Sequence, residues 1–256
     1  MERSVALVTG AAGGIGEAVV RLLAEQNAAV AAVDRDAARL TGTVDKLIAE
    51  GLNVSAYPAD VTSSHEVETL VDTVEREVGP VDRLVNSAGV LRLGEVGALT
   101  DEDWTATFAV NANAVFFVSR AVANRMIPRG GGAVVTVASN AAGTARAEMA
   151  AYAASKAAAT TFTKCLGLEL AQHNIRCNVV APGSTDTPML HGMHTTDTAA
   201  AASVTGRPDA YRVGIPLGKI ARPQDIAEAV VFLLSEAADH ITLHTLTVDG
   251  GATLGV

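Results

Sequence analysis

A short apolar segment near the start of the chain runs directly into a glycine-rich turn and then into a helical pattern. Residues 4–9 are apolar and β-branched, which predicts a buried strand. The turn reads Thr9-Gly-Ala-Ala-Gly-Gly-Ile-Gly16, and the apolar positions that follow predict a helix over 14–26. Glycines let the backbone approach a pyrophosphate, and free N–H groups at a helix start attract its charge. This order predicts a dinucleotide site at the end of the first strand.

Strand and helix patterns alternate along the rest of the chain without a separating linker. The alternation predicts one α/β domain over 1–256, a doubly wound Rossmann fold. Its seven-stranded parallel sheet should carry helices on both faces and ligands at the carboxyl ends of the strands. The irregular stretch 184–214 follows a strand and predicts a substrate lid. The further expected strands are 29–34, 53–57, 82–86, 132–138, 175–180 and 244–248, and the further helices are 36–50, 63–78, 101–127, 149–172 and 223–236.

Composition limits the class of protein. The chain has 256 residues, of which 49% are hydrophobic, enough for one large core. Its formal net charge of −9 argues against nucleic acid or an anionic membrane as a partner. Cys165 and Cys177 lack a ligand-like spacing, so we predict neither a metal site nor a disulfide framework. No run of eighteen apolar residues and no apolar N-terminal segment occurs, so the predicted location is the cytoplasm.

The end of the second predicted strand bears on the choice of cofactor. Asp34 stands there, twenty-four residues after Gly10. A carboxylate at this place accepts hydrogen bonds from both hydroxyls of the adenosine ribose and repels a 2′-phosphate. This favours NAD over NADP. Arg35 follows immediately and could pair with a phosphate, so the residues alone leave the choice open.

Residues at the other strand ends complete the predicted cofactor site. Small residues there leave room for the cofactor, and polar residues can hold its adenine and carboxamide groups. The expected cofactor residues are Gly10, Gly14, Ile15, Gly16, Asp34, Asp60, Val61, Asn86, Ala88, Pro182, Gly183, Thr185 and Thr187.

Tyr152 and Lys156 lie four residues apart in a predicted helix, with Ser139 thirteen residues upstream of the tyrosine. A spacing of four places both side chains on one helix face. A cation beside a phenol favours the phenolate, which predicts a lowered pKa for Tyr152. Tyr152 is therefore a candidate general base for removing a proton from an alcohol.

Together these motifs resemble the short-chain dehydrogenase/reductase family over nearly the whole chain. The resemblance implies that Tyr152 is the acid/base and that Ser139 orients the substrate oxygen. It implies that Lys156 lowers the pKa of Tyr152 and binds the nicotinamide ribose, which places both residues beside the cofactor. Asn111 would support a water in a proton relay. The resemblance also implies a homotetramer, for which 101–127 and 149–172 offer alanine-rich faces. Ser87, where a second Asn is commoner, departs from the motif.

Further segments resemble the 2,3-dihydro-2,3-dihydroxybenzoate dehydrogenases of catechol-siderophore synthesis. These are 88–94, 103–111, 135–139, 175–187, 214–224 and 240–255. The resemblance implies NAD-dependent oxidation of a ring alcohol on a cyclohexadiene carboxylate. The resulting dienone tautomerises to an aromatic catechol, 2,3-dihydroxybenzoate, which drives the oxidation forward.

A carboxylated cyclic alcohol requires a cation near the catalytic group. Arg146 lies seven residues after Ser139 and six before Tyr152, and its planar fork suits a carboxylate. Arg92 is a second candidate, between two leucines that could pack on a flat ring. Glu148 would oppose the substrate charge unless it faces solvent. The expected substrate residues are Leu91, Arg92, Leu93, Arg146, Met149 and Met189.

Other functions remain open at this point. A trans-2,3-dihydro-3-hydroxyanthranilate dehydrogenase needs the same cofactor and ring carboxylate, and Glu148 or Asn140 near its amine would favour it. A related ketoreductase would work in the opposite direction, which the NAD preference implied by Asp34 disfavours. A cofactor-binding regulator without chemistry would not need Ser139 and Tyr152.

Overall fold

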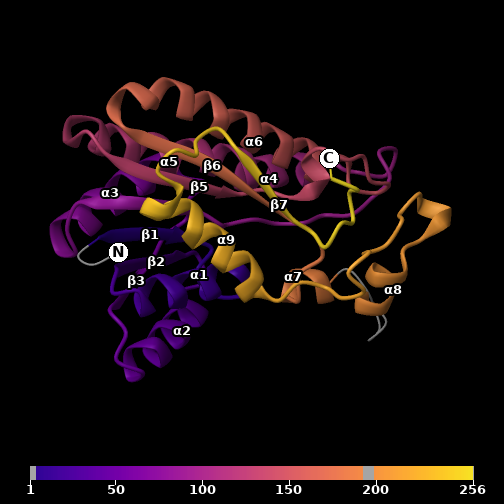
Figure 1. Cartoon of the computed structure of the whole chain (residues 1–256), viewed down its shortest axis with the longest axis horizontal. Coiled ribbons are helices and arrows are strands. Elements are labelled where there is room, and N and C mark those ends of the chain that lie inside the picture. Colours follow the sequence, from indigo (N-terminus) through magenta and orange to yellow (C-terminus); the bar gives the residue numbers. More distant parts are fainter. Residues whose placement is uncertain (1–3, 193–198, 256) are drawn as a thin grey trace.

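The computed structural model describes residues 4–192 and 199–255. Within these residues one sheet of seven strands has the order β3-β2-β1-β4-β5-β6-β7, and neighbouring strands are parallel throughout (Figure 1). The predicted doubly wound parallel sheet is confirmed. The strands are β1 (Val5–Thr9), β2 (Ala29–Asp34), β3 (Val54–Pro58), β4 (Val81–Asn86), β5 (Gly132–Val137), β6 (Ile175–Pro182) and β7 (Thr245–Val248).

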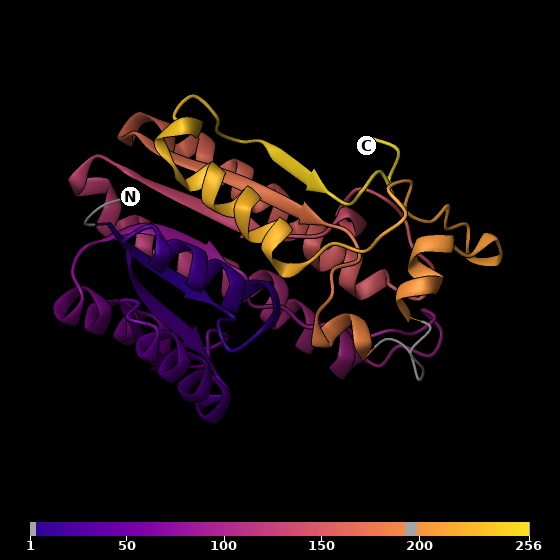
Figure 2. The same ribbon diagram turned by 60° about the horizontal axis from the view of Figure 1, so that its bottom comes forward.

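Helices cover both faces of this sheet, as the alternation predicts. One core cluster packs α1 (Gly14–Glu25), α2 (Ala37–Ala49) and α9 (Pro223–Leu234) on one face (Figure 2). The other packs α3 (Ser64–Glu77), α5 (Ala114–Met126) and the end of α6 (Ala150–Leu170) on the opposite face. The remaining helices are α4 (Asp101–Phe108), α7 (Pro188–His191) and α8 (Ala199–Thr205), with short 3₁₀ turns at Ile127–Arg129, Asn140–Ala142, Ala171–His173, Pro208–Ala210 and Glu236–Ala238.

Strand β1 shows why the first apolar run has no polar position. Val5 and Leu7 pack into the cluster with α3 and α5, whereas Ala6 and Val8 pack into the cluster with α1 and α9. All four are buried. A central parallel strand is covered on both faces, so both of its alternating sets of side chains must be apolar.

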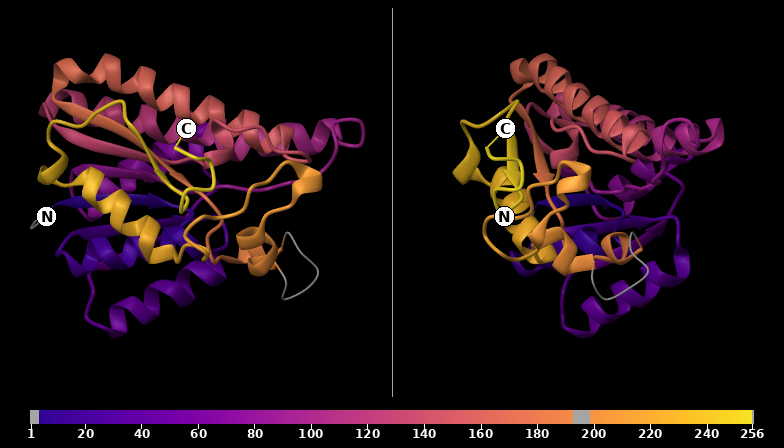
Figure 3. Two further views of the ribbon diagram at one scale, coloured as in Figure 1. Left: turned by 45° about the vertical axis from the view of Figure 1, so that its right-hand side comes forward. Right: turned by 90° about the vertical axis from the view of Figure 1, so that its right-hand side faces the viewer.

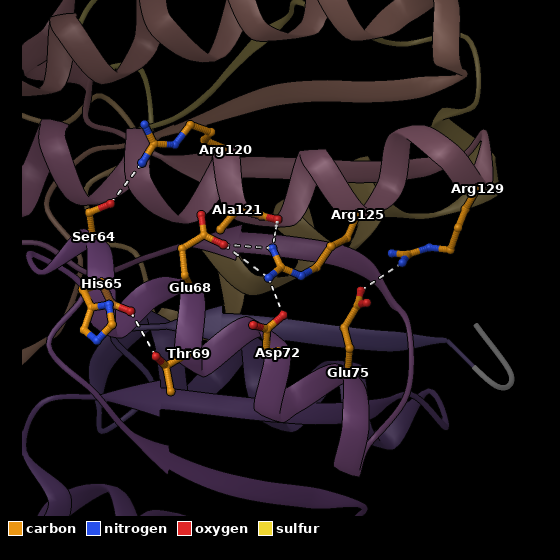
Figure 4. A network of polar contacts seen from close by, with 10 residues as sticks. All are labelled: Ser64, His65, Glu68, Thr69, Asp72, Glu75, Arg120, Ala121, Arg125 and Arg129. Atoms are coloured by element: carbon orange, nitrogen blue, oxygen red, sulfur yellow. Dashed lines mark hydrogen bonds and ion pairs between the residues drawn. The ribbon is translucent and has the colours of Figure 1, made fainter.

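Polar contacts join α3 to α5 at the surface of the second face (Figure 4). The Arg125 guanidinium lies 3.2 Å from the Glu68 carboxylate and also contacts Asp72, while Arg129 lies 3.0 Å from Glu75. The acidic residues follow one another at helical spacing, so they share one side of α3. Partly exposed ion pairs contribute about 1 kcal/mol or less each, so the apolar packing beneath dominates the contact between these helices.

The helix predicted over 101–127 is interrupted in its middle. Residues Ala109–Asn113 form a π-helical turn between α4 and α5, in which the Ala114 N–H bonds to the Ala109 carbonyl. The stretch Asp101–Arg129 is apolar and long enough to span a membrane by composition, but half of its most apolar window is buried. The buried face of α5 packs into the core cluster of the sheet, which accounts for its composition.

The stretch 184–214 is more regular than the sequence indicated. It contains α7, α8 and the turn at Pro208–Ala210, and residues 193–198 of the predicted lid lie outside the described residues. The described parts extend beyond the carboxyl ends of the strands (Figure 3). They are thus placed at the sheet edge where the fold predicts the ligands.

Candidate active site

A cavity of about 440 Å³ opens at the carboxyl ends of strands β1 to β6. It brings together most of the side chains and backbone segments that the sequence predicted for the cofactor and substrate. The predicted residues that line it are Gly10, Gly14, Ile15, Gly16, Asp34, Asp60, Val61, Ala88, Leu91, Ser139, Arg146, Met149, Tyr152, Lys156, Pro182, Gly183, Thr185, Thr187 and Met189.

The glycine-rich turn forms a backbone cradle at one end of this cavity. Gly10 has φ +70°, and a Cβ added to it would lie 2.7 Å from the Ala88 backbone. A Cβ on Gly16 would lie 2.0 Å from the Gly10 carbonyl oxygen. Side chains at these two positions would therefore break the close contact between the turn and its neighbours. A bare backbone turn that opens helix α1 fits the pyrophosphate of a dinucleotide.

The Asp34 carboxylate is fixed at the end of β2. One of its oxygens accepts the Ala12 N–H at 3.1 Å and the other accepts the Asp36 N–H at 3.0 Å. Each carboxylate oxygen has a second acceptor site, so both remain able to bind ribose hydroxyls. The Arg39 guanidinium lies over the turn, 2.7 Å from the position of a Cβ on Gly13. Arg39 also lines the cavity and was not anticipated from the sequence.

Ser139, Tyr152 and Lys156 converge at the other end of the cavity. Ser139 follows β5, and its hydroxyl accepts the Ala141 N–H at 3.1 Å, which caps the next turn. Tyr152 and Lys156 lie one turn apart on α6, and the Lys156 ammonium is 6.0 Å from the centre of the Tyr152 ring. Lys156 Nζ donates to the Val137 carbonyl at 2.9 Å. All three side chains are buried.

Two arginines also line the cavity. Arg146 and Arg212 both line it, and both are half-buried. Arg212 was not anticipated, because it stands sixty residues after Tyr152 in a stretch without a motif. Glu148 is exposed and does not line the cavity, although its charge acts on Arg212.

Comparisons with known proteins identify the family. The short chain dehydrogenase family matches residues 4–198. The chain is a short-chain dehydrogenase. A relative from Bacillus subtilis, named 2,3-dihydro-2,3-dihydroxybenzoate dehydrogenase, is 54% identical over 100% of this chain and 98% of its own length. A protein of the same name from Escherichia coli is 42% identical over 97% of this chain and 96% of its own length.

Solved structures agree with this family. The structure of a gluconate 5-dehydrogenase from Burkholderia cenocepacia, in complex with NADP and tartrate, superposes with a TM-score of 0.92. It is 32% identical and covers 100% of this chain and 97% of that chain. The dehydrogenase described here is thus an oxidoreductase, and the family together with the Asp34 carboxylate is consistent with NAD as its cofactor.

The pKa of Tyr152 differs from the sequence-based expectation. In the protein alone, burial raises the pKa of the Tyr152 phenol, and a hydrogen bond with Ser139 opposes that rise. Burial also lowers the pKa of Lys156 to about 8, because the same apolar surroundings disfavour the charged ammonium. The expected lowering by Lys156 is therefore wrong for the dehydrogenase without cofactor. Desolvation is the largest cause of the shift of the Tyr152 pKa.

We expect the lowered pKa of Lys156 to make the stability of the dehydrogenase depend on pH. Its pKa is about 8 when folded and near 10.5 when unfolded, so the unfolded chain binds more protons between these values. Between pH 8 and 10.5, the free energy of unfolding should therefore rise relative to Lys156→Met, by on the order of 3 kcal/mol in total. Urea denaturation without cofactor measures it. Parallel pH curves for the two proteins would contradict the buried ammonium.

Asn86 and Asn111, predicted for the cofactor and the catalytic group, do not line the cavity. The Asn86 side chain is buried and donates to Ser119 Oγ at 2.9 Å, so it braces the sheet below the cofactor site. The Asn111 amide accepts the Val90 N–H and donates to the Val90 carbonyl and to Ser155. These bonds use both of its N–H groups. The side chain of Asn111 therefore braces two segments, and its support of a relay water stays a prediction.

The substrate prediction needs a similar correction. Leu91, Arg146, Met149 and Met189 line the cavity, but Arg92 and Leu93 do not. Arg92 lies 2.6 Å from the Asp103 carboxylate, and both side chains are partly exposed. Arg92 was predicted to contact substrate because it follows a strand end closely in the sequence. The Asp103 carboxylate, eleven residues later, instead holds its guanidinium outside the cavity.

The cofactor preference can be tested at Asp34. We expect Asp34→Ala to improve catalytic efficiency with NADP relative to NAD by about tenfold or more, since a fixed carboxylate no longer repels the 2′-phosphate. Arg35 and Arg39, which line the same cavity, remain to attract it. The ratio of kcat/KM for the two cofactors measures the change.

Asp60→Ala is the matched control, because Asp60 is another strand-end carboxylate on the cavity. It should leave the ratio near that of the wild type. A wild-type enzyme that uses NADP as efficiently as NAD would refute the role given to Asp34.

Proposed function

We propose that this dehydrogenase oxidises a ring alcohol of 2,3-dihydro-2,3-dihydroxybenzoate with NAD, yielding 2,3-dihydroxybenzoate for catechol-siderophore synthesis. The observation that carries the proposal is the Arg146 guanidinium, which lines the same cavity as Ser139 and Tyr152. Among the described residues it has no ion-pair partner within 4 Å. A half-buried cation beside the catalytic group calls for an anionic substrate.

Asp249 is the carboxylate whose charge acts on Arg146, but it does not form an ion pair with the guanidinium. The Asp249 oxygens instead accept bonds from Asn140, Gly251 and Thr253. Burial and the charge of Arg212 lower the pKa of Arg146. An arriving carboxylate would relieve both effects, because an opposite charge within hydrogen-bond distance favours the charged form.

The catalytic side chains can divide the reaction between them. Bound NAD supplies the acceptor for the hydride that leaves the alcohol carbon. Tyr152, as phenolate, takes the hydroxyl proton, and the Ser139 hydroxyl holds the oxygen that becomes a carbonyl. The Lys156 ammonium favours the phenolate against the effect of burial. Asn111 positions the segment around Val90 that borders the site.

The substrate loses one hydride and one proton and becomes a conjugated dienone. This dienone carries one hydrogen on the ring carbon beside its new carbonyl. Movement of that hydrogen to oxygen gives the aromatic catechol, which makes the overall oxidation favourable. The site needs to bind a flat ring, and Leu91 and Met149 border the cavity and pack beside Tyr152 in a small apolar cluster.

The structure gives less support to an amino-substituted substrate than the sequence did. Glu148 is exposed, and the Asn140 amide donates to Asp249 at 3.2 Å. Glu148 is thus not presented to a substrate amine, whereas Asn140 lines the cavity with its NH2 group held by Asp249. A sugar acid is the stronger competitor, because 5-keto-D-gluconate 5-reductase from Escherichia coli is 37% identical to this chain.

Steady-state formation of NADH with a panel of acids tests the proposal. The panel contains 2,3-dihydro-2,3-dihydroxybenzoate, trans-2,3-dihydro-3-hydroxyanthranilate, gluconate and a neutral cyclohexadiene diol. We expect the first to have the highest kcat/KM and to yield a product with the absorption of a catechol. A higher value for gluconate would make the protein a sugar-acid dehydrogenase and overturn the proposal.

We further propose a cytoplasmic homotetramer. Phe116 on α5 and Leu168 on α6 are exposed, at 38% and 70%, which supports a subunit contact across these helices. Cys165 and Cys177 are both free thiols, which suits a reducing compartment. Analytical ultracentrifugation of the wild type measures the number of subunits, and a monomer would refute the assembly.

A further inference from the structure

We infer that Arg212 is a second carboxylate-binding residue, which shares the ring carboxylate with Arg146. The inference rests on the proposed function and goes beyond it. Substrate recognition would also depend on the segment 206–214, which follows Tyr152 by more than fifty residues. Arg212 lines the same cavity as Arg146, Met149 and Tyr152.

The two guanidiniums lie within electrostatic reach of each other. The charge of Arg212 contributes to the lowered pKa of Arg146, after burial. Burial likewise lowers the pKa of Arg212, with a further contribution from Arg207 and an opposing one from Glu148. Two desolvated cations at one cavity repel each other, and a folded protein keeps such an arrangement only at a cost in stability. A ligand with two equivalent anionic oxygens removes that cost.

No protein carboxylate occupies this position in the described part of the chain. Neither Arg146 nor Arg212 forms a salt bridge there. Glu148 is exposed and acts on Arg212 only through its charge. Structural arginines of this fold have protein partners: two carboxylates of α3 hold Arg125, and Arg176 donates to the backbone carbonyls of Leu233 and Ser235.

The backbone around Arg212 is built tightly enough to present its side chain at a fixed place. Arg207 and Arg212 exchange two backbone hydrogen bonds, at 2.8 and 2.9 Å, which closes a turn between them. Gly206 and Gly214 flank this turn with φ +83° and +86°. A Cβ on Gly206 would lie 2.6 Å from the Gly214 nitrogen, so the two ends touch backbone to backbone.

This arrangement suits a carboxylate better than one arginine alone. A carboxylate has two oxygens with about four acceptor sites, and each guanidinium can donate to one side of it. The two cations come from segments that are far apart in sequence, so together they fix the plane of the acid group as well as its charge. A neutral diol would meet the same two cations without compensating them.

Ligand binding separates this role from a structural one. Isothermal titration in saturating NAD compares 2,3-dihydroxybenzoate with catechol, the same ring without the acid group. We expect Arg212→Gln to weaken binding of the carboxylate about tenfold or more and to change catechol binding by less than about twofold. Arg212→Lys should fall between the wild type and Arg212→Gln, because an ammonium keeps the charge without the fork.

Two further variants complete the design. Arg92→Gln, which removes a surface cation outside the cavity, should bind both ligands like the wild type. Arg146→Gln combined with Arg212→Gln should weaken binding by less than the product of the single effects, since the two side chains share one group.

The outcomes are distinct. Unchanged binding of 2,3-dihydroxybenzoate by Arg212→Gln, with a loss in Arg146→Gln, would overturn the assignment and leave the proposed function standing. Equal loss of catechol and 2,3-dihydroxybenzoate would show that Arg212 only supports the segment, which also overturns it. A wild type that does not distinguish the two ligands would refute the proposed function and this inference together.

Discussion

Replacement of Tyr152 with Phe is expected to lower dehydrogenation of the substrate by about two to four orders of magnitude. The substitution removes the oxygen that accepts the proton as phenolate and keeps the ring, which is 8% exposed and packs against Met149 and Ala141. Stability and NAD binding should therefore change little. Steady-state kinetics measures turnover, and titration with NAD measures cofactor affinity.

Tyr57→Phe serves as the matched control, because its hydroxyl bonds to Glu77 at 3.2 Å on β3, away from the cavity. It should retain wild-type turnover. Substantial activity in Tyr152→Phe would mean that another group takes the proton, and the assignment of the general base would fail.

Replacement of Arg146 with Ala should lower kcat/KM for the carboxylated substrate about thirty-fold or more, which corresponds to about 2 kcal/mol or above for a charge-assisted pair. A neutral cyclic alcohol should be oxidised as by the wild type, since it makes no bond to the guanidinium. Lys at this position should restore only part of the loss. The comparison of kcat/KM for the two substrates measures the effect.

Arg92→Ala is the control for this experiment, because Arg92 pairs with Asp103 outside the cavity. Its kinetics with both substrates should resemble those of the wild type. Equal losses for the carboxylated and neutral substrates in Arg146→Ala would show that Arg146 holds its loop and does not contact the acid group.

The sheet, the main helices and the cofactor end of the cavity could be predicted from the sequence. The reason is physical: buried strands such as β1 need unbroken apolar runs, and the turn at Gly10 and Gly16 admits no side chain. Tyr152 and Lys156 could be placed because a helix puts residues four apart on one face. These features depend on local geometry or on period, which the sequence displays directly.

The parts that escaped prediction depend on contacts between distant segments. Arg92 and Arg146 are both cations near a strand end, and only the position of Asp103 decides that the first is paired at the surface. Arg212 has no local motif, although its two flanking glycines mark a tight turn. The Tyr152 pKa depends on how deeply the whole site is buried, and no spacing in the sequence expresses burial.

The π-helical turn at Ala109–Asn113 sets the angle between Asn111 and the buried face of α5. A regular α-helix advances about 100° per residue, so one additional residue in a turn rotates everything beyond it by that angle. The face of α5 that packs on the sheet is therefore out of phase with α4. Removal of one residue would give the helix regular hydrogen bonds and, in the same step, carry either Asn111 or the apolar side of α5 away from its partners. The bulge thus lets one helix serve two unrelated surfaces, and it makes this turn intolerant of changes in chain length that a surface loop would accept.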